Sequence, residues 1–429
     1  MRIVPLTKDT KEEALRALIG RSPAGYDEYE KTVREIIENV RKKGDSALVA
    51  YARQFDRCEM TPEQFMVTKE EKEAAYRALS PQFVEVIRRA AANIREFHEK
   101  QKLNSWITTE NSGIILGQKI TPIEVSGCYV PGGRAVYPSS VLMNVIPAKA
   151  AGVSKIMVMT PPGPDGCAPA GTIVAADIAG ADVIYKVGGA QAIAAMAYGT
   201  QTIPKADKIT GPGNIFVALA KKACFGVTGI DSVAGPSEIL VIADETADPR
   251  FVAADLLSQA EHDPLASAIL LTTDAALAQA VSDEVDGFLK VLSRREIIGQ
   301  SLDNYGYIFV GESMEDLVDA ANTIASEHLE IMTKDPYAVM TGIRNAGAIF
   351  LGPYSSEPLG DYYAGPNHIL PTNGTARFFS PLGVNDFVKR TSIISYSRQA
   401  LEAVSADIEL FAEEEGLTAH ANSIRVRFE

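Results

Sequence analysis

The sequence predicts an α/β fold with open, mostly parallel sheets. Between residues 156 and 351, short apolar runs alternate with stretches of helical periodicity, and this alternation favours parallel sheets covered by helices on both faces. A chain of 429 residues is also too long for one ordinary hydrophobic core. We therefore expect two such sheets, one ending near Ser237 and the other running to about Leu382.

The first hundred residues carry helical patterns. Residues 26–42 place apolar side chains at the spacing that lines one helix face. Pro81 begins a second long helix that continues to about Lys102, since proline is favoured in a first turn. His98 lies beside the apolar stripe of this helix, where we expect a surface or partly packed histidine. From 113 to 130, β-branched residues interrupted by glycine and proline predict a hairpin.

The strands and helices of the two sheets follow in order along the chain. The apolar runs that we assign to strands are 156–159, 183–185, 239–242, 268–271, 308–310 and 348–351. The stretches that we assign to helices include 170–179, 191–198 and 274–292. A last helix is predicted over 400–414, in a segment too small to fold alone. We expect this segment to dock on a larger body, such as a second subunit.

Composition narrows the functional classes. Hydrophobic residues make up 46% and charged residues 22% of the chain, which is an ordinary globular balance. The net charge of -14 argues against a nucleic-acid partner, because phosphate binding depends on clustered lysine and arginine. No apolar stretch approaches the roughly 20 residues of a membrane span, and the N-terminus lacks the apolar core of a signal peptide. We expect a cytoplasmic protein with no membrane partner, and reduced thiols for its four cysteines, which form no Cys-x-x-Cys pair.

Four of the five histidines lie in the C-terminal half, beside other side chains that serve in catalysis: His262, His328, His368 and His420. They indicate a metal or proton-transfer site. Gln259 and His262 are three residues apart near the end of a predicted helix, so both can face a bound metal. The alternative there is a helix C-terminus with a solvated polar face. Asp361 and His420 offer further donors that zinc accepts, although no spacing brings them together.

The Glu327-His328 dipeptide lies where a predicted helix over 315–325 meets a short apolar run. We expect a loop at this junction, and loops favour exposed chemistry. The histidine could move protons near neutral pH and the glutamate could activate water. The competing interpretation is a surface dipeptide without a role.

Three glycine-rich turns accompany these residues, at 131–133, 188–191 and 211–214. Glycine lets backbone amides approach a ligand closely, and helices that start just after such turns can bind anions. An ordinary loop is the competing interpretation for each turn. The sequence contains no Gly-x-Gly-x-x-Gly fingerprint of dinucleotide-binding folds, so the turns alone do not establish such a site.

Taken together, these runs resemble the histidinol dehydrogenase family. The matching segments follow the family order over nearly the whole chain and are 41–48, 127–133, 137–143, 188–195, 211–214, 234–238, 259–264, 327–330 and 365–372. The resemblance implies two incomplete Rossmann-like domains with small N- and C-terminal helical segments. The implied division is an N-terminal segment (1–25), a first Rossmann-like domain (26–130 and 237–382) with most of the zinc and catalytic site, a second, NAD-contacting Rossmann-like domain (131–236) and a C-terminal dimerisation tail (383–429).

The resemblance also implies roles for individual residues. The ligands of one zinc ion per subunit would be Gln259, His262, Asp361 and His420. The acid–base pair would be Glu327 and His328. Substrate contacts would come from Ser237, Gln259, His262, His328, Asp361, His368, Glu415 and His420, and NAD contacts from Tyr129, Gln191 and Asn214. The implied assembly is a homodimer in which the C-terminal tail completes the neighbour's site.

The implied reaction is the oxidation of L-histidinol to L-histidine through L-histidinal, with two NAD reduced, in the last steps of histidine biosynthesis. His328 would take the hydroxyl proton, and Glu327 would help water to add to the aldehyde. One alternative is a relative that oxidises another small alcohol, such as a sulfonated diol, but Glu327, His368 and Glu415 favour histidinol. A zinc-dependent hydrolase is disfavoured because the sequence has no His-Glu-x-x-His and leaves the glycine turns unexplained. The number of acid–base groups disfavours a non-catalytic metal-binding protein.

Overall fold

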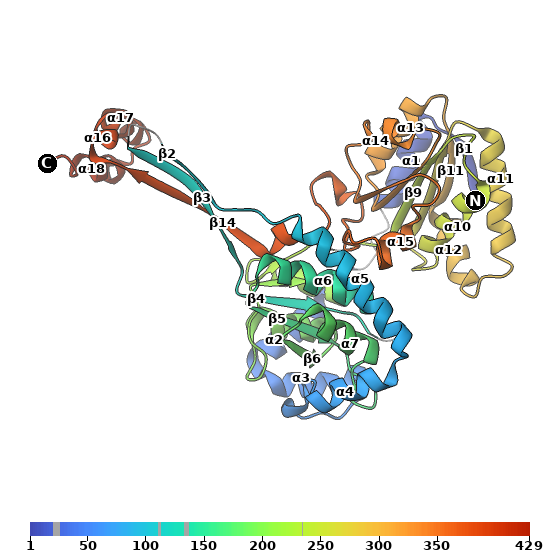
Figure 1. The fold of residues 1–429 in the computed structure, drawn as a ribbon, viewed down its shortest axis with the longest axis horizontal. Coiled ribbons are helices and arrows are strands. Elements are labelled where there is room, and N and C mark those ends of the chain that lie inside the picture. Colours follow the sequence, from blue (N-terminus) through green and yellow to red (C-terminus); the bar gives the residue numbers. More distant parts are fainter. Residues whose placement is uncertain (20–25, 110–112, 133–136, 234) are drawn as a thin grey trace. The chain divides into compact units, whose positions relative to one another are not determined.

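The computed structural model describes residues 1–19, 26–109, 113–132, 137–233 and 235–429. The chain divides into two compact units: Met1–Gln101 joins Glu124–Phe387 in the larger one, and Lys102–Ile123 joins Val388–Glu429 in the smaller one. Within the described ranges the strands form three sheets, two of them parallel and in the larger unit (Figure 1). None of the helices in these ranges is long and apolar enough to cross a membrane.

The first parallel sheet of the larger unit has the strand order β1-β11-β10-β9-β12-β13. Its strands are β1 (Arg2–Pro5), β9 (Glu238–Ala243), β10 (Ser267–Thr272), β11 (Gly306–Val310), β12 (His328–Met332) and β13 (Ala348–Leu351). The four apolar runs that predicted strands in this part of the sequence are confirmed. Every residue of β9, β10 and β12 is buried, as expected for a parallel sheet that is covered on both faces.

Helices cover both faces of this sheet because side chains alternate across each strand. Ile239 and Val241 pack with the helices of one face, which are α10 (Pro249–Ala260), α11 (Ala275–Phe288) and α12 (Arg295–Tyr305). Leu240 and Ile242 pack with those of the other, α1 (Lys8–Ile19) and α13 (Met314–Ile324). The short helices α14 (Pro336–Met340) and α15 (Glu357–Tyr362) follow β12 and β13.

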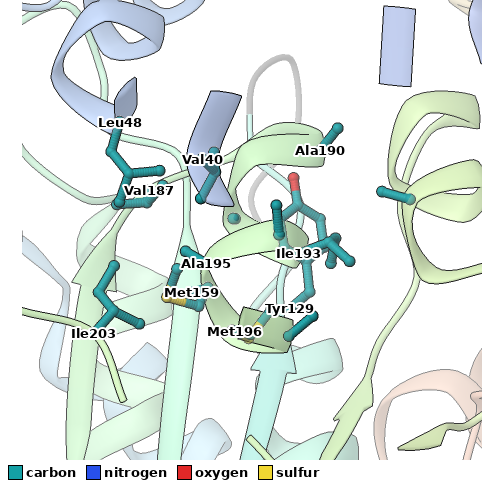
Figure 2. Packing of buried hydrophobic residues seen from close by; sticks show 14 of the residues in the cluster. Val40, Leu48, Tyr129, Met159, Val187, Ala190, Ile193, Ala195, Met196 and Ile203 are labelled. Carbon is teal, nitrogen blue, oxygen red and sulfur yellow. The ribbon is translucent and has the colours of Figure 1, made fainter. Parts of the chain in front are cut away.

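The second parallel sheet has the strand order β6-β5-β4-β7-β8. Its strands are β4 (Val125–Tyr129), β5 (Lys155–Thr160), β6 (Val183–Lys186), β7 (Lys208–Thr210) and β8 (Gly229–Ile230). The helices that pack with it and with one another are α2 (Tyr26–Lys43), α3 (Asp45–Tyr51), α4 (Lys69–Ala78), α5 (Pro81–Glu99), α6 (Pro138–Ala151), α7 (Ala170–Ala179), α8 (Gly189–Tyr198) and α9 (Ile215–Cys224). Figure 2 shows one core of this part, in which Leu48 lies beside Val187, and Val40, Ile193 of α8 and Met159 of β5 belong to the same buried cluster.

The structure differs from the expected grouping of 26–130 with 237–382. The apolar stripe of α2 packs into the core of the second sheet, and β4 is the central strand of that sheet. Residues 26–101 and 124–130 therefore belong with 131–236, whereas β1 and α1, expected in a separate N-terminal segment, complete the first sheet. Helical periodicity predicts that a helix has an apolar face, but it does not indicate which sheet that face packs against.

The smaller unit is built on an antiparallel sheet in the order β14-β3-β2. It contains β2 (Trp106–Thr109), β3 (Ile114–Pro122), β14 (Val388–Tyr396), α16 (Arg398–Glu402), α17 (Ser405–Glu414) and α18 (Thr418–Arg425). In Figure 1, β3 and β14 run side by side as a long ribbon toward these three helices. The C-terminal segment thus folds together with residues 102–123 of its own chain.

Two predictions for this region are wrong. The hairpin expected over 113–130 does not form, because β3 pairs with β2 and β14 while β4 joins a parallel sheet. The burial patterns explain the split, since β3 is half-exposed and β4 is almost wholly buried. The single helix expected over 400–414 is divided between α16 and α17.

His98 is also more deeply placed than expected. Its side chain is fully buried, with Nδ1 2.7 Å from the Ile94 carbonyl oxygen and Nε2 3.4 Å from the Asn367 side-chain nitrogen. Asn367 in turn donates to the Met143 carbonyl at 2.7 Å. Because a buried polar group needs such partners, His98 is a core residue that ties α5 and α6 to the segment just before His368.

Candidate functional site

Most of the predicted site residues line one cavity of the larger unit, about 390 Å³ in volume. Those that line it are Ser237, Gln259, His262, Glu327, His328, Asp361, His368 and Asn214. The structure therefore brings together residues that are up to 154 positions apart, which no local spacing indicated.

Local topology explains how Ser237, Glu327 and His328 come together. β9 and β12 are neighbouring parallel strands, and His328 pairs with Ile239 in their register. Ser237 and Glu327 directly precede these strands, so both lie at the amino ends of the sheet. α10 returns from the far end of β9 and brings Gln259 and His262 to the same edge. Open α/β sheets usually bind ligands at the carboxyl ends of their strands, so this edge is an unusual place for a site.

Glu327 and Glu238 are held against each other by reciprocal hydrogen bonds. The Glu238 amide donates to Glu327 Oε2 at 3.0 Å, and the Glu327 amide donates to Glu238 Oε2 at 3.2 Å. Burial, and after it the Glu238 charge, raises the pKa of Glu327 well above its usual value. Glu327 is thus a buried carboxyl with an increased proton affinity, rather than the exposed loop residue that we expected.

His328 is a neutral imidazole with a defined tautomer. Burial is the main cause that lowers its pKa, to about 4. Nδ1 lies 3.0 Å from the Glu238 carbonyl oxygen, which can only accept a hydrogen bond, so Nδ1 carries the proton. Nε2 therefore carries the lone pair and is the nitrogen able to take up a proton. It lies 3.9 Å from Glu357 Oε1.

His368 has a comparable arrangement on another part of the cavity wall. Its Nδ1 lies 3.0 Å from the Asp361 carbonyl oxygen, and its Nε2 lies 3.4 Å from the Ser140 hydroxyl of α6. Burial lowers the pKa of His368 to about 4. This neutral ring is therefore fixed between α6 and α15 and can offer hydrogen bonds rather than charge.

The expected metal ligands of this unit, Gln259, His262 and Asp361, line the same cavity and offer oxygen and nitrogen donors. Gln259 is 1% exposed, and neither of its amide atoms has a hydrogen bond of normal geometry in the described part of the chain. Burial raises the pKa of Asp361 to about 6, and burial followed by the Asp361 charge raises that of Glu357 to about 8. A buried amide without partners and buried carboxyls that lack a compensating cation fit a divalent metal ion.

Glu357 is a member of this cluster that sequence reasoning missed. Donor atoms of His328, Glu357 and Asp361 all lie within 4.8 Å of one another. Glu357 precedes Asp361 by four residues on α15, and this spacing places both side chains on one helix face. That spacing was the signal in the sequence that could have identified it.

A second, larger cavity of about 1190 Å³ lies at the carboxyl ends of β4 and β6. The three residues expected to contact NAD line it: Tyr129, Gln191 and Asn214. The Gly189 amide donates to the Tyr129 hydroxyl at 3.1 Å, and the Asn214 side chain caps α9 by accepting from the Phe216 amide at 3.1 Å. Gly211 has φ +115°, and a Cβ there would collide with the Tyr129 carbonyl, so this turn requires glycine.

The remaining predicted residues lie elsewhere or outside the described ranges. Glu415 follows α17 and His420 lies in α18, so both belong to the smaller unit, where they are exposed. Gly133 of the first glycine turn and Ala234 of a matching segment lie outside the described residues. The larger unit therefore supplies three of the four expected metal ligands from its own residues.

Comparison with known proteins gives matches over the whole fold. A family model described as histidinol dehydrogenase matches residues 20–428. The histidinol dehydrogenase of Halalkalibacterium halodurans is 57% identical over 405 residues, which cover 94% of this chain and 95% of that protein. The one of Bacillus subtilis is 57% identical over 404 residues, with 94% of each chain covered. The crystal structure of histidinol dehydrogenase from Elizabethkingia anophelis has a TM-score of 0.94 at 38% identity and covers 100% of this chain and 98% of that chain.

Proposed function

Because the chain belongs to the histidinol dehydrogenase family, we propose that it oxidises L-histidinol to L-histidine through L-histidinal, with two NAD reduced, in the last steps of histidine biosynthesis. The observation that carries this proposal is that Gly132 and Asn214 line both cavities. Hydride transfer requires the two reactants to be held in contact. A cavity with acid–base residues that shares part of its wall with a second, larger cavity supports a dehydrogenase over a hydrolase.

The proposed metal ion is zinc, one per subunit. Gln259, His262 and Asp361 would hold it, together with His420 of the C-terminal segment, and the buried, unpaired Gln259 amide supports this assignment. When bound, zinc supplies a fixed positive charge that holds the nitrogen atoms of the substrate in place. The chain's own residues then carry out the proton transfers.

His328 is the proposed base for the alcohol. Its ring is neutral because burial lowers its pKa to about 4, and its Nδ1 proton is directed to the Glu238 carbonyl. Nε2 can therefore take the hydroxyl proton while the C–H bond of the same carbon breaks. NAD, when bound, supplies the acceptor for the hydride.

Glu327 is the proposed base for the second oxidation. Burial and the neighbouring Glu238 charge raise its pKa, so the ionised carboxylate has an increased affinity for a proton. It takes a proton from water as that water adds to the carbonyl carbon of L-histidinal. The resulting hydrate carries the hydrogen that the second oxidation removes, which gives the carboxylate of histidine.

The remaining proposed site residues contact either the substrate or NAD. Ser237, His368 and Glu415 would contact the substrate, and the fixed His368 ring supports this role because its hydrogen-bonding atoms are already oriented. Tyr129, Gln191 and Asn214 would contact NAD. Gln191 is 3% exposed yet lines the larger cavity, and a buried amide there suits hydrogen bonds to a polar cofactor.

A homodimer with a shared active site is part of the proposal. The smaller unit exposes large apolar side chains: Ile107 is 60%, Ile394 72% and Phe411 70% exposed. Apolar surface of this kind marks interaction sites, and a second copy of the chain would cover it while its tail, residues 383–429, supplies His420 and Glu415. We also propose a cytoplasmic location, which the four unpaired cysteines support.

A steady-state assay tests the proposed substrate. The purified, zinc-loaded protein is given NAD with either L-histidinol or a small sulfonated diol, and NADH is followed. We expect NADH from L-histidinol alone. A Glu327→Gln, His328→Gln double variant controls for contaminating dehydrogenases and should give none. NADH from the diol alone would contradict the proposed substrate, and no NADH from either compound would contradict the proposed activity.

A further inference from the structure

We propose that Glu357 is a positioning residue of the metal site, which orients the Gln259 amide so that its oxygen faces the metal. This inference rests on the proposed zinc site and assigns a residue outside its four ligands. An amide ligand poses a particular problem, because only its oxygen can bind a cation while its NH₂ group has nearly the same shape. A neighbouring acceptor that binds the NH₂ group removes this ambiguity.

The Glu357 carboxylate is fixed through one of its oxygens. Glu357 is 2% exposed, its backbone amide donates to Glu330 Oε1 at 2.8 Å, and the Ser258 hydroxyl donates to Glu357 Oε2 at 3.1 Å. Ser258 is the residue before Gln259 on α10. The contact therefore joins α15 to α10 directly beside the expected ligand.

The second oxygen, Glu357 Oε1, remains available to accept a hydrogen bond from a neighbouring side chain. It has no hydrogen-bond partner of normal geometry in the described ranges, and neither amide atom of Gln259 has one. The two groups lie on helices that the Ser258–Glu357 contact joins at the residue before Gln259, and Gln259 is among the neighbours that affect the pKa of Glu357, after burial and Asp361, which both raise it. An amide can stabilise a carboxylate only through its NH₂ group, and this leaves Gln259 Oε1 free for a cation.

Direct binding of the metal by Glu357 is the competing role. Its Oε1 lies 3.9 Å from His328 Nε2, so a cation held by that oxygen would also lie against the nitrogen that serves as the proposed base. A metal there would block proton uptake by His328. If Glu357 instead positions Gln259, His328 Nε2 stays able to take up a proton. Glu357 Oε1 and the Gln259 amide then become partners of each other, as residues that hydrogen-bond to metal ligands commonly do.

The test compares three variants for zinc affinity, measured by competition with a chelating dye in the absence of substrate. Glu357→Met removes the acceptor at similar volume, and we expect affinity to fall by about 10- to 100-fold. Glu357→Gln keeps an oxygen that can accept from the Gln259 NH₂ group and should restore affinity to within a few-fold of the parent protein. Glu330→Gln alters a neighbouring buried carboxyl that holds the Glu357 backbone amide and interacts with Asp255 of α10. It keeps an oxygen for that amide and should leave affinity within a few-fold of the parent protein.

A double-mutant cycle tests the specific partner. In a Gln259→Ala background, Glu357→Met should lower zinc affinity no further, because no amide remains to be oriented. An equal loss in both backgrounds would overturn the positioning role, as would an equal loss in Glu357→Gln and Glu357→Met, which indicates a direct ligand. Thermal unfolding of the zinc-free variants checks that each is folded. If the parent protein binds zinc and oxidises L-histidinol while Glu357→Met keeps full affinity, only this inference fails and the proposed function stands.

Discussion

Glu238 and Glu327 each accept a hydrogen bond from the other's backbone amide, across the amino ends of two neighbouring parallel strands. The arrangement fixes the Glu327 side chain without using both of its oxygens. It also places two carboxyls close together in a buried site, where like charges oppose ionisation. Glu238 therefore sets both the position and the proton affinity of Glu327, although sequence reasoning did not single it out.

Replacing Glu238 by glutamine should shift the pH dependence of aldehyde oxidation. The amide oxygen can still accept from the Glu327 backbone, but after burial the Glu238 charge is the next cause that raises the pKa of Glu327. Its removal lowers that pKa, so ionised Glu327 persists to lower pH. The acidic limb of kcat/KM for L-histidinal should move to lower pH in a pH–rate profile. A limb that stays in place or moves upward would contradict this role.

Replacing Glu327 by glutamine should separate the two oxidations. Loss of a positioned general base costs about 10²- to 10⁴-fold, and the account assigns Glu327 to water addition only. L-histidinal oxidation should therefore slow far more than L-histidinol oxidation. Each compound is supplied separately, and the rate of formation of the first NADH is measured in a single turnover. Equal losses in both steps would show that Glu327 serves the alcohol step as well.

The buried Lys221–Asp231 ion pair should support the 211–214 turn, whose Asn214 lines both cavities. Lys221 is 2% exposed and donates to the Gly211 carbonyl at 2.9 Å, while Asp231 accepts from the Gly211 amide at 2.8 Å. Lys221→Met leaves the Asp231 carboxylate buried and unpaired, so the free energy of unfolding should fall by about 3–5 kcal/mol. The KM for NAD should rise because the turn before Asn214 is released.

The neighbouring Lys222 provides the control for this change. It is exposed and its ion pair with Glu30, at 3.3 Å, lies on the surface, so Lys222→Met should change the unfolding free energy by no more than about 1 kcal/mol. Urea denaturation of the two variants measures the difference. Similar small effects in both would mean that the Lys221 pair does not stabilise this turn.

The longer buried strands of the two parallel sheets were the most predictable part of the fold. The run 239–242 lies within β9 and 268–271 within β10, because strands buried on both faces have continuous apolar sequences. The edge strand β13 also matched its predicted run although it is only partly buried, whereas the short strands β7 and β8 were missed. β1 was not predicted, since its four residues are mostly exposed and carry no such run. β14 was also missed, because half-exposed strands owe their position to a distant partner, here β3.

The candidate site was predictable in its residues and not in its arrangement. Histidine next to acidic residues indicated the chemistry of Glu327 and His328, and family resemblance supplied the wider set. No local pattern indicated that these residues are buried at the amino ends of their strands, because that depends on which strands are neighbours. Glu238 was missed for the same reason, because its carboxylate binds the backbone of a neighbouring strand. Glu357 could have been found from its spacing to Asp361 on one helix, but its contact with Ser258 of α10 could not.

Subunits with different defects should complement one another if the site is shared. His420→Ala removes a proposed ligand from the tail, and Glu327→Gln removes a base from the larger unit. In a mixed dimer with tail exchange, one of the two sites would combine an intact tail with an intact Glu327. Mixing the variants under conditions of subunit exchange should therefore restore part of the activity. No recovery, with exchange verified by differently tagged subunits, would argue for sites built within one chain.

The number of NADH molecules formed per L-histidinol consumed shows whether one protein performs both oxidations. The zinc-loaded protein is incubated with a limiting amount of L-histidinol and excess NAD, and the product is identified. We expect two NADH per L-histidinol, with L-histidine as the product, because Glu327 and His328 serve successive oxidations in one cavity. One NADH with free L-histidinal, or no NADH while zinc is bound, would contradict it.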